Sequence, residues 1–229
     1  GIKMSKSKGN VVSPDDLVRD YGCDSLRMYE LFVGPPELDS EWDDRGIDGV
    51  NRFLNRFWNL VMDNKDSGVQ ADKEMLKVRN RMIHEITTRL ENFSLNTVVS
   101  GFMEYTNKMI DMARNGGIDK ETLKTAVIML SPFAPHIGEE LWRQLGGTDS
   151  VFHAVWPAAD KEAMADDEKE VAVQVNGKTK MVVTIPVEIS KEDAIAAGRK
   201  ALEDAGKLSG TVVKEIYVPG KIINIVAKP

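Results

Sequence analysis

The spacing of the apolar residues changes once along this chain of 229 residues, and that change constrains the fold more than any other feature. Up to about residue 156, apolar residues recur every three to four positions, which places them on one face of an α-helix. From Val171 onward the period is two, because Val171, Val173 and Val175 alternate with smaller or polar residues. A period of two indicates a strand with one buried face. The sequence therefore predicts a helical part followed by a part that contains strands.

The helical part contains several apolar stripes separated by turn residues such as Gly34-Pro35-Pro36 and Ser131-Pro132. The stripes are formed by Val50, Leu54, Phe57, Trp58 and Val61; by Met82, Ile86, Leu90 and Phe93; and by Val98, Phe102, Tyr105, Met109 and Met112. An earlier helix should start at Ser13-Pro14, since serine caps helices and proline fits the first helical position. These patterns predict a loop with a helical connector over residues 1–45 and an antiparallel α-helical bundle over residues 46–156.

Residues 157–168 are rich in Pro, Ala and Asp and have no period, which is typical of a linker. Beyond them, Asn176-Gly177 indicates a two-residue hairpin, and Ser190 can cap a helix. The predicted elements are strands over residues 171–176 and 178–186, a helix over residues 190–205, and strands over residues 212–218 and 221–226. The sequence thus predicts a small α+β domain with the order ββαββ over residues 169–229.

The charged residues are distributed unevenly between these two parts. The formal net charge is -6, but residues 171–229 hold nine Lys or Arg against six Asp or Glu, a charge of +3. Residues 1–170 hold 21 basic and 30 acidic groups, a charge of -9. Such asymmetry indicates that the tail has a partner of its own. On charge alone, a solvated surface with a chance imbalance explains it equally well.

Cysteine and histidine are too sparse for a disulfide or a zinc site. Cys23 is the only cysteine, and His84, His136 and His153 lack zinc-ligand spacing. A single cysteine suits a reducing, cytoplasmic location, and no apolar run has the length of a membrane span. Because Gly1-Ile2 leads directly into a dense polar loop, we expect the chain to be a fragment of a longer protein.

That loop, Lys3-Met4-Ser5-Lys6-Ser7-Lys8-Gly9-Asn10, carries the clearest chemistry in the sequence. Three lysines alternate with serines, so a mobile loop can place ammonium groups, hydroxyls and backbone N–H groups around a polyphosphate. Nucleotidyl transfer needs such positive charge because negative charge builds up on the leaving pyrophosphate. On composition alone, a solvated, flexible terminus is the favoured interpretation, because short Lys/Ser runs are common in disordered ends.

The complete string is more specific. Residues 3–7 are identical to the KMSKS signature of class I aminoacyl-tRNA synthetases, and KGNVVSPDDLVRDYGCDSLRMYELFVGPPE resembles the segment that follows it in the leucyl, valyl, isoleucyl and methionyl subgroup. This resemblance implies binding of ATP with Mg²⁺ by the KMSKS loop (residues 3–7), through Lys3, Met4, Ser5, Lys6 and Ser7. It also implies that Lys6 is the main catalytic candidate and Lys3 a weaker one, and that both stabilise the triphosphate. Cys23 stands where relatives usually have a small residue and is expected to be buried in packing.

Two segments, NRFLNRFWNLV and SPFAPHIGEELW, resemble the anticodon-binding bundle of the same subgroup. His136 lies in the second segment, beside a helix start, and we expect it to be structural and not catalytic. Five arginines of the bundle can contact an RNA backbone or form salt bridges on a solvated face, and the sequence leaves both open. They are Arg52, Arg56, Arg79, Arg81 and Arg89.

The tail distinguishes members of the subgroup. VAVQVNGKTKMVVTIPVEISKEDAIAAGRK and VKEIYVPGKIINIVAKP resemble the C-terminal domain of bacterial-type leucyl-tRNA synthetases, which contacts the outer corner of tRNA. The resemblance implies phosphate contacts with leucine tRNA, and the alternative for any one lysine is a role in solubility alone. The candidate lysines are Lys178, Lys180, Lys214 and Lys221.

No His-Ile-Gly-His-like sequence occurs in these 229 residues, so we expect the catalytic domain that binds ATP and leucine to be absent from this chain. We therefore expect a monomeric C-terminal fragment of leucine–tRNA ligase, which is inactive alone, retains no cofactor and contacts no membrane. The alternatives are a fragment of a valyl, isoleucyl or methionyl enzyme, or a non-catalytic protein-interaction module, which the charge of -6 would suit.

Overall fold

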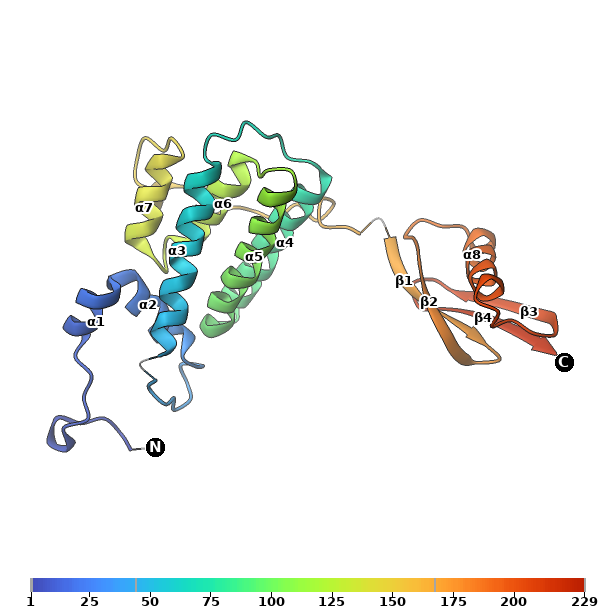
Figure 1. The fold of residues 1–229 in the computed structure, drawn as a ribbon, viewed down its shortest axis with the longest axis horizontal. Helices are drawn as coiled ribbons and strands as arrows, with labels where there is room; N and C mark the ends of the chain where they lie inside the picture. Colours follow the sequence, from blue (N-terminus) through green and yellow to red (C-terminus); the bar gives the residue numbers. More distant parts are fainter. Residues whose placement is uncertain (1, 44, 167, 229) are drawn as a thin grey trace. The chain divides into compact units, whose positions relative to one another are not determined.

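The computed structural model describes residues 2–43, 45–166 and 168–228 and divides the chain into two compact units, Gly1–Met164 and Ala165–Pro229. The first unit is helical and the second contains a small four-stranded mixed sheet, as Figure 1 shows. This confirms the predicted change from helices to a sheet. None of the helices in the described ranges is long and apolar enough to cross a membrane.

The helical unit begins with two short helices and continues with longer ones. Its helices are α1 (Pro14–Tyr21), α2 (Cys23–Phe32), α3 (Gly46–Asn64), α4 (Lys73–Glu91), α5 (Leu95–Asn115), α6 (Lys120–Leu130) and α7 (Pro135–Gln144). Two 3-10 turns, η1 (Lys6–Lys8) and η2 (Val151–His153), lie before and after them. The long helices α3, α4 and α5 run side by side in Figure 1, and their apolar stripes face one another in a single core.

Most residues of the stripes predicted from the sequence form that core, but Trp58, Leu90 and Met112 are only partly buried and Phe93 lies outside it. Val50, Phe57 and Val61 of α3 are buried, but Trp58 is only partly buried because it lies at the margin of the stripe. Phe93 was predicted to extend the stripe of α4, and that prediction is wrong. The helix ends at Glu91, and Phe93 follows in a left-handed conformation (φ 56°) with 64% of its surface exposed.

A buried carboxylate joins the first helices to the end of the unit. Asp24 in α2 is 5% exposed and accepts hydrogen bonds from the backbone N–H groups of His136 (3.3 Å) and Ile137 (2.8 Å) at the start of α7. Its Oδ1 also lies 2.8 Å from His136 Nδ1. Asp24 therefore caps α7 from a residue more than a hundred positions away, and this satisfies N–H groups that a helix start leaves without partners.

The neighbouring residues of α2 and α3 strengthen the same junction. Asn51 Nδ2 donates to the carbonyl of Tyr21 and to Ser25 Oγ, each at 3.1 Å. Helices α1, α2, α3 and α7 thus meet around polar groups that are hydrogen-bonded to one another. A buried polar group that has its partners fixes the relative placement of the elements that carry it.

The first half of the segment expected to be a linker is anchored on α4. Trp156 Nε1 donates to Thr87 Oγ1 (3.0 Å), and the backbone N–H of Asp160 donates to Asn80 Oδ1 (2.8 Å). Arg81 donates to the carbonyl oxygen of Met164 through Nε (3.2 Å) and Nη2 (3.1 Å). Side chains of one face of α4 therefore hold the chain up to Met164.

The second unit is made of β1 (Glu168–Val175), β2 (Lys178–Pro186), α8 (Lys191–Asp204), β3 (Thr211–Val218) and β4 (Ile222–Lys228). The strand order is β2-β1-β4-β3; β1 and β4 are parallel, and the other neighbours are antiparallel. Helix α8 lies on one face of the sheet (Figure 1). The core between them contains Val171, Val173, Ile185, Ala194, Leu202, Ile223 and Ile225.

The hairpin and the helix cap that the sequence predicts in this unit are both present. Asn176 and Gly177 both have positive φ (50° and 79°), the conformation that a two-residue hairpin requires. The Asn176 side chain also donates to the carbonyl of Ala227 and accepts from its N–H, each at 3.0 Å, which attaches the hairpin to β4. Ser190 Oγ accepts from the N–H of Asp193 (3.0 Å) and so caps α8.

We expect Asp24→Ala to lower the free energy of unfolding of the helical unit by about 2–4 kcal/mol, because it leaves the start of α7 buried without acceptors. All four tryptophans lie between residues 42 and 156, so urea unfolding followed by tryptophan fluorescence reports on this unit. Asp111→Ala, an exposed position on α5, is the matched control and should change stability by less than about 0.5 kcal/mol. Equal urea midpoints for the two variants would contradict the capping role.

Candidate nucleic-acid interface

The KMSKS loop forms a short turn outside the helices. Residues Lys6–Lys8 make the 3-10 turn η1, and Gly9 ends it in a left-handed conformation (φ 64°) that suits a residue without Cβ. The backbone N–H of Ser5 donates to Asn10 Oδ1 (2.9 Å), and the hydroxyls of Ser5 and Ser7 lie 3.2 Å apart. Asn10 therefore closes the loop through a side-chain contact with the backbone.

The lysines of this loop are available for a ligand. Lys3, Lys6 and Lys8 are exposed, and within the described residues none of them forms an ion pair. Three unpaired ammonium groups within six residues, with two serine hydroxyls between them, can surround a phosphate chain. The residues present thus fit a triphosphate, and no carboxylate of the described ranges forms an ion pair with these lysines.

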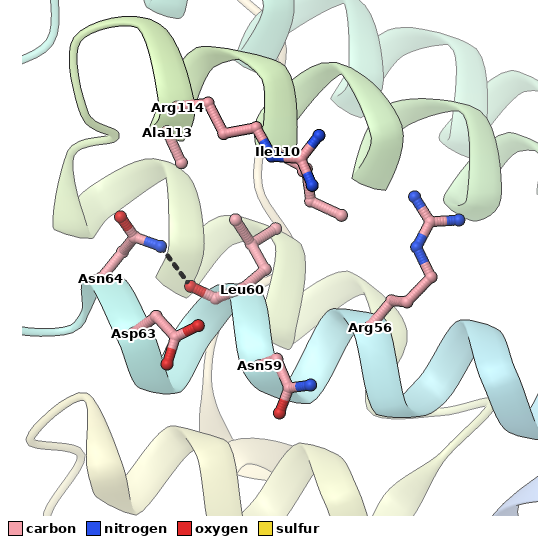
Figure 2. A pocket seen from close by; sticks show the side chains of 8 residues that line it. All are labelled: Arg56, Asn59, Leu60, Asp63, Asn64, Ile110, Ala113 and Arg114. Atoms are coloured by element: carbon pink, nitrogen blue, oxygen red, sulfur yellow. Dashed lines mark hydrogen bonds between the residues drawn. The ribbon is translucent and has the colours of Figure 1, made fainter.

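A groove lies between α3 and α5 in the helical unit. It has a volume of ≈330 Å³ and is lined by Arg56, Asn59, Leu60, Asp63, Asn64, Ile110, Ala113 and Arg114. Figure 2 shows Arg56 rising from α3 toward α5, and the guanidinium of Arg114 lying along α5 beside Ile110. Asn64 Nδ2 donates to the carbonyl of Leu60 (2.8 Å), which keeps that amide at the wall of the groove. Two guanidinium groups beside amides suit a phosphate oxygen.

The structure separates the five arginines that the sequence left undecided. Three of them are engaged with the protein: Arg79 with Asp119 (3.5 Å), Arg81 with Met164 O, and Arg89 with the carbonyl of Thr97 (2.8 Å). Arg89 also pairs with Glu85 and Glu104, each at 3.7 Å. These three arginines therefore stabilise the fold and have little left for a ligand.

The remaining two arginines, Arg52 and Arg56, lie on α3. Arg56 donates to Asn107 Oδ1 but pairs with no carboxylate among the described residues, and the same is true of Arg52 and Arg114. Arg114 was not singled out from the sequence. Its only signal there is a basic residue in the last turn of a helix, which is common for dipole reasons and so does not indicate a site.

The four tail lysines do not form one cluster. Lys178 lies in the same cross-strand row as Val175, Ile225 and Glu215, and Lys214 pairs with Val226 in the next row. Lys221 directly precedes β4 at its other end, where its carbonyl accepts a hydrogen bond from the N–H of Ala172 in β1. Lys178, Lys180 and Lys214 therefore lie toward one end of the sheet, and Lys221 lies toward the other.

Cys23, His136 and His153 form no reactive cluster within the described ranges. His136 is structural, because its ring and backbone belong to the Asp24 junction. Cys23 is half-buried and lines a hollow near that junction, so the expectation of a fully buried cysteine is wrong: it begins α2, where part of its surface faces outward. His153 is exposed, and its hydrogen bond with Asp149 raises the pKa of the imidazole. In the described ranges, no three His, Cys, Asp or Glu residues could hold a metal ion.

Two family models match the chain. The model for "Anticodon-binding domain of tRNA ligase" matches residues 72–195, and the model for "tRNA synthetases class I (I, L, M and V)" matches residues 1–43. The second match contains the KMSKS loop with α1 and α2. The first begins at α4 and continues through the hairpin of β1 and β2 into α8, so it includes parts of both structural units.

Whole-chain relatives and a solved structure agree with these matches. A leucine–tRNA ligase of Fervidobacterium nodosum is 43% identical over 247 residues, which are 100% of this chain and 30% of the relative. One of Deinococcus radiodurans is 42% identical over 236 residues, covering 100% and 29%. The crystal structure of the ternary complex of Agrobacterium radiobacter K84 agnB2 LeuRS, tRNA and LeuAMS matches with a TM-score of 0.79 at 30% identity, covering 99% of this chain and 31% of that one.

The chain spans about 30% of the length of the relatives that it matches. These relatives favour the leucyl interpretation over the valyl, isoleucyl and methionyl alternatives. Since the anticodon-binding model covers more than half of the residues, the chain belongs to the family of tRNA-ligase anticodon-binding domains, and along its whole length it is homologous to part of the leucine–tRNA ligases.

Proposed function

We propose that this chain is the tRNA-binding part of a leucine–tRNA ligase, which attaches leucine to its tRNA with ATP through a leucyl-adenylate. The observation that carries the proposal is that both structural units, including the KMSKS loop of the first, align with leucine–tRNA ligases at more than 40% identity over the whole chain. The solved neighbour is itself a complex with tRNA.

In the helical unit, residues 46–156 act as the anticodon-binding bundle. The groove between α3 and α5 supplies Arg56 and Arg114, whose guanidinium groups point at a hollow and have no carboxylate partner among the described residues. Phosphate contacts of this kind position an RNA without reading its sequence. Arg52, one turn before Arg56, extends the basic surface along α3.

The C-terminal domain, residues 169–229, with the order ββαββ, contacts the outer corner of the tRNA. Lys178, Lys180 and Lys214 contribute phosphate contacts from one end of the sheet, and Lys221 contributes from the other. Lysines at two ends of a sheet suit an extended backbone, and the shape of the RNA supplies the discrimination. The excess charge of +3 in residues 171–229 supports this assignment. Residues 157–168 are the linker in this arrangement, and Arg81 holds it to α4 as far as Met164.

The KMSKS loop handles ATP once the catalytic domain is present. Lys6 and Lys3 stabilise the triphosphate as pyrophosphate leaves, and Met4, Ser5 and Ser7 complete the contact surface. Mg²⁺ would be held chiefly through the phosphates, as this ion usually keeps its waters and binds few protein ligands. The chain alone carries no leucine pocket and is inactive, and it works as a monomer in the cytoplasm, where its single cysteine stays reduced.

We expect the chain to bind leucine tRNA more tightly than valine tRNA, with an affinity that falls steeply as salt rises, because phosphate contacts release counterions. The double variant Arg56→Ala/Arg114→Ala should bind both tRNAs more weakly. It should also reduce the magnitude of the slope of log K against log salt by about two, one for each lost phosphate contact. Filter binding across a salt series measures this.

Arg143→Ala is the matched control, since Arg143 is an exposed arginine of α7 outside the groove. It should leave the slope unchanged. Binding that is weak and independent of salt would support the rival interpretation, a protein-interaction module.

We expect Lys6→Ala, made in the leucine–tRNA ligase that contains this chain, to slow ATP–pyrophosphate exchange by about 100-fold or more, because it removes a charge that stabilises the leaving pyrophosphate. Lys6→Arg should retain more activity than Lys6→Ala, and the exposed Lys161→Ala should change the rate by less than about twofold. Exchange by the chain alone, or an unimpaired Lys6→Ala enzyme, would contradict the assignment.

A further inference from the structure

The chain contains two Asn-Gly pairs, Asn115-Gly116 and Asn176-Gly177. An asparagine that precedes glycine deamidates readily, because glycine has no Cβ to hinder its backbone nitrogen when that nitrogen attacks the side-chain carbonyl carbon. The attack forms a succinimide and releases ammonia, and water then opens the ring to aspartate or isoaspartate. Each pair is thus a candidate modification site, and the two pairs differ in how the fold holds them.

The pair in the C-terminal unit is held on both sides of the reaction. Asn176 donates through Nδ2 to the carbonyl of Ala227 and accepts at Oδ1 from its N–H, each at 3.0 Å. The attacking nitrogen is held as well, since the N–H of Gly177 donates to Asn224 Oδ1 (3.0 Å). The carbonyl carbon and this nitrogen can therefore meet only after the hairpin has separated from β4, which is a local unfolding step.

The pair in the helical unit is held much less. Asn115 is the last residue of α5, and its exposed side chain forms no hydrogen bond within the described part of the chain. The N–H of Gly116 donates to the carbonyl of Met112 (3.1 Å), and the N–H of Gly117 donates to the same oxygen (3.2 Å). The attacking nitrogen thus shares one acceptor at the end of a helix, where fraying is common. Opening of the last turn of α5 is enough to free it.

The position of Asn115 gives its deamidation a consequence. Asn115 directly follows Arg114, which lines the groove between α3 and α5 together with Arg56 and Asp63. Two guanidinium groups and one carboxylate give the charged side chains of the lining a sum of +1. An aspartate or isoaspartate at position 115 places a negative charge next to Arg114 and offsets that excess, which lowers the attraction of the groove for an anion.

We propose that Asn115 is a site of spontaneous deamidation, and that the carboxylate formed there weakens the binding of RNA phosphate in the groove between α3 and α5. The backbone nitrogen of Gly116 forms a bond to Cγ of Asn115, and the side-chain amide nitrogen leaves as ammonia. The proton of the attacking N–H passes through water to the departing nitrogen. One water molecule then hydrolyses the succinimide, so the reaction needs no oxidant and no second substrate.

The first test ages the whole folded chain at neutral pH and follows both Asn-Gly pairs by peptide mapping, with separation of the aspartate and isoaspartate forms. Asn115 should be lost about tenfold or more faster than Asn176, because only Asn176 must first break the contacts of the hairpin with β4. In urea, where both pairs are unfolded, the two rates should approach each other. If Asn176 reacts as fast as Asn115 in the folded chain, or if Asn115 reacts only in urea, the site is refuted.

Two variants identify the attacking nitrogen and the protecting contact. Gly116→Ala should slow the loss of Asn115 severalfold, since its methyl group hinders the attack, and a Cβ at this position meets no atom within 4 Å. An unchanged rate would contradict attack by this nitrogen, provided that the variant unfolds at the wild-type temperature. Asn224→Ala removes the acceptor of the Gly177 N–H, so it should speed the loss of Asn176 and leave that of Asn115 unchanged.

The second test measures what the new charge does to RNA binding. Asn115→Asp should weaken the binding of leucine tRNA at low salt by about threefold, and the neutral variant Asn115→Ser is the matched control. In an Arg114→Ala background the effect of Asn115→Asp should shrink, because the charge that the carboxylate opposes is gone. An equal effect in both backgrounds, or an equal effect of Asn115→Ser, would refute the action on the groove.

The outcomes also separate this inference from the proposed function, on which its effect on RNA rests. If leucine tRNA binds with a steep salt dependence while Asn115 stays intact in the folded chain, the modification site is refuted and the proposed function stands. If Asn115 deamidates but the chain binds no tRNA at any salt, the modification is confirmed, and the proposed function fails together with the effect on RNA.

Discussion

The capping of α7 by Asp24 is the contact on which the arrangement of the helical unit depends. Its carboxylate is buried, so it must have donors, and the start of α7 provides them. Because α1 and α2 follow the KMSKS loop directly, the same contact links the segment that carries the loop to the helices that carry the arginine groove.

Basic side chains in this protein fall into two groups, which differ in the protein atoms that they bind. Arg79, Arg81 and Arg89 are occupied by protein oxygens, and these contacts join helices to one another or hold the chain after α7. Among the described residues, the KMSKS lysines, Arg56 and Arg114 have no carboxylate partner, and Arg56 donates only to the side-chain oxygen of Asn107. A net charge of -6 is therefore compatible with binding a polyanion, because ligands meet local surfaces and not the average.

The sequence predicted best what depends on neighbours along the chain. The change of period located the helices and the sheet, Asn176-Gly177 located the hairpin, and Ser190 located the start of α8, because turns and caps are set by residues a few positions apart. It failed at Phe93, where the helix ended two residues before the stripe did. The full KMSKS string likewise indicated a family that the comparisons support, since a loop motif is itself a local pattern.

What required the tertiary structure is the pairing of distant groups. The sequence by itself determined the elements, the two structural classes and the chemistry of the first loop. It did not determine that Asp24 caps α7, which of five arginines are occupied, or that Arg114 faces Arg56 across a groove. Nor did it show that Glu215 has an oxygen without a donor. The physical reason is that burial and hydrogen bonding depend on which residues meet in space, and residues far apart in the chain meet only when helices and strands have packed.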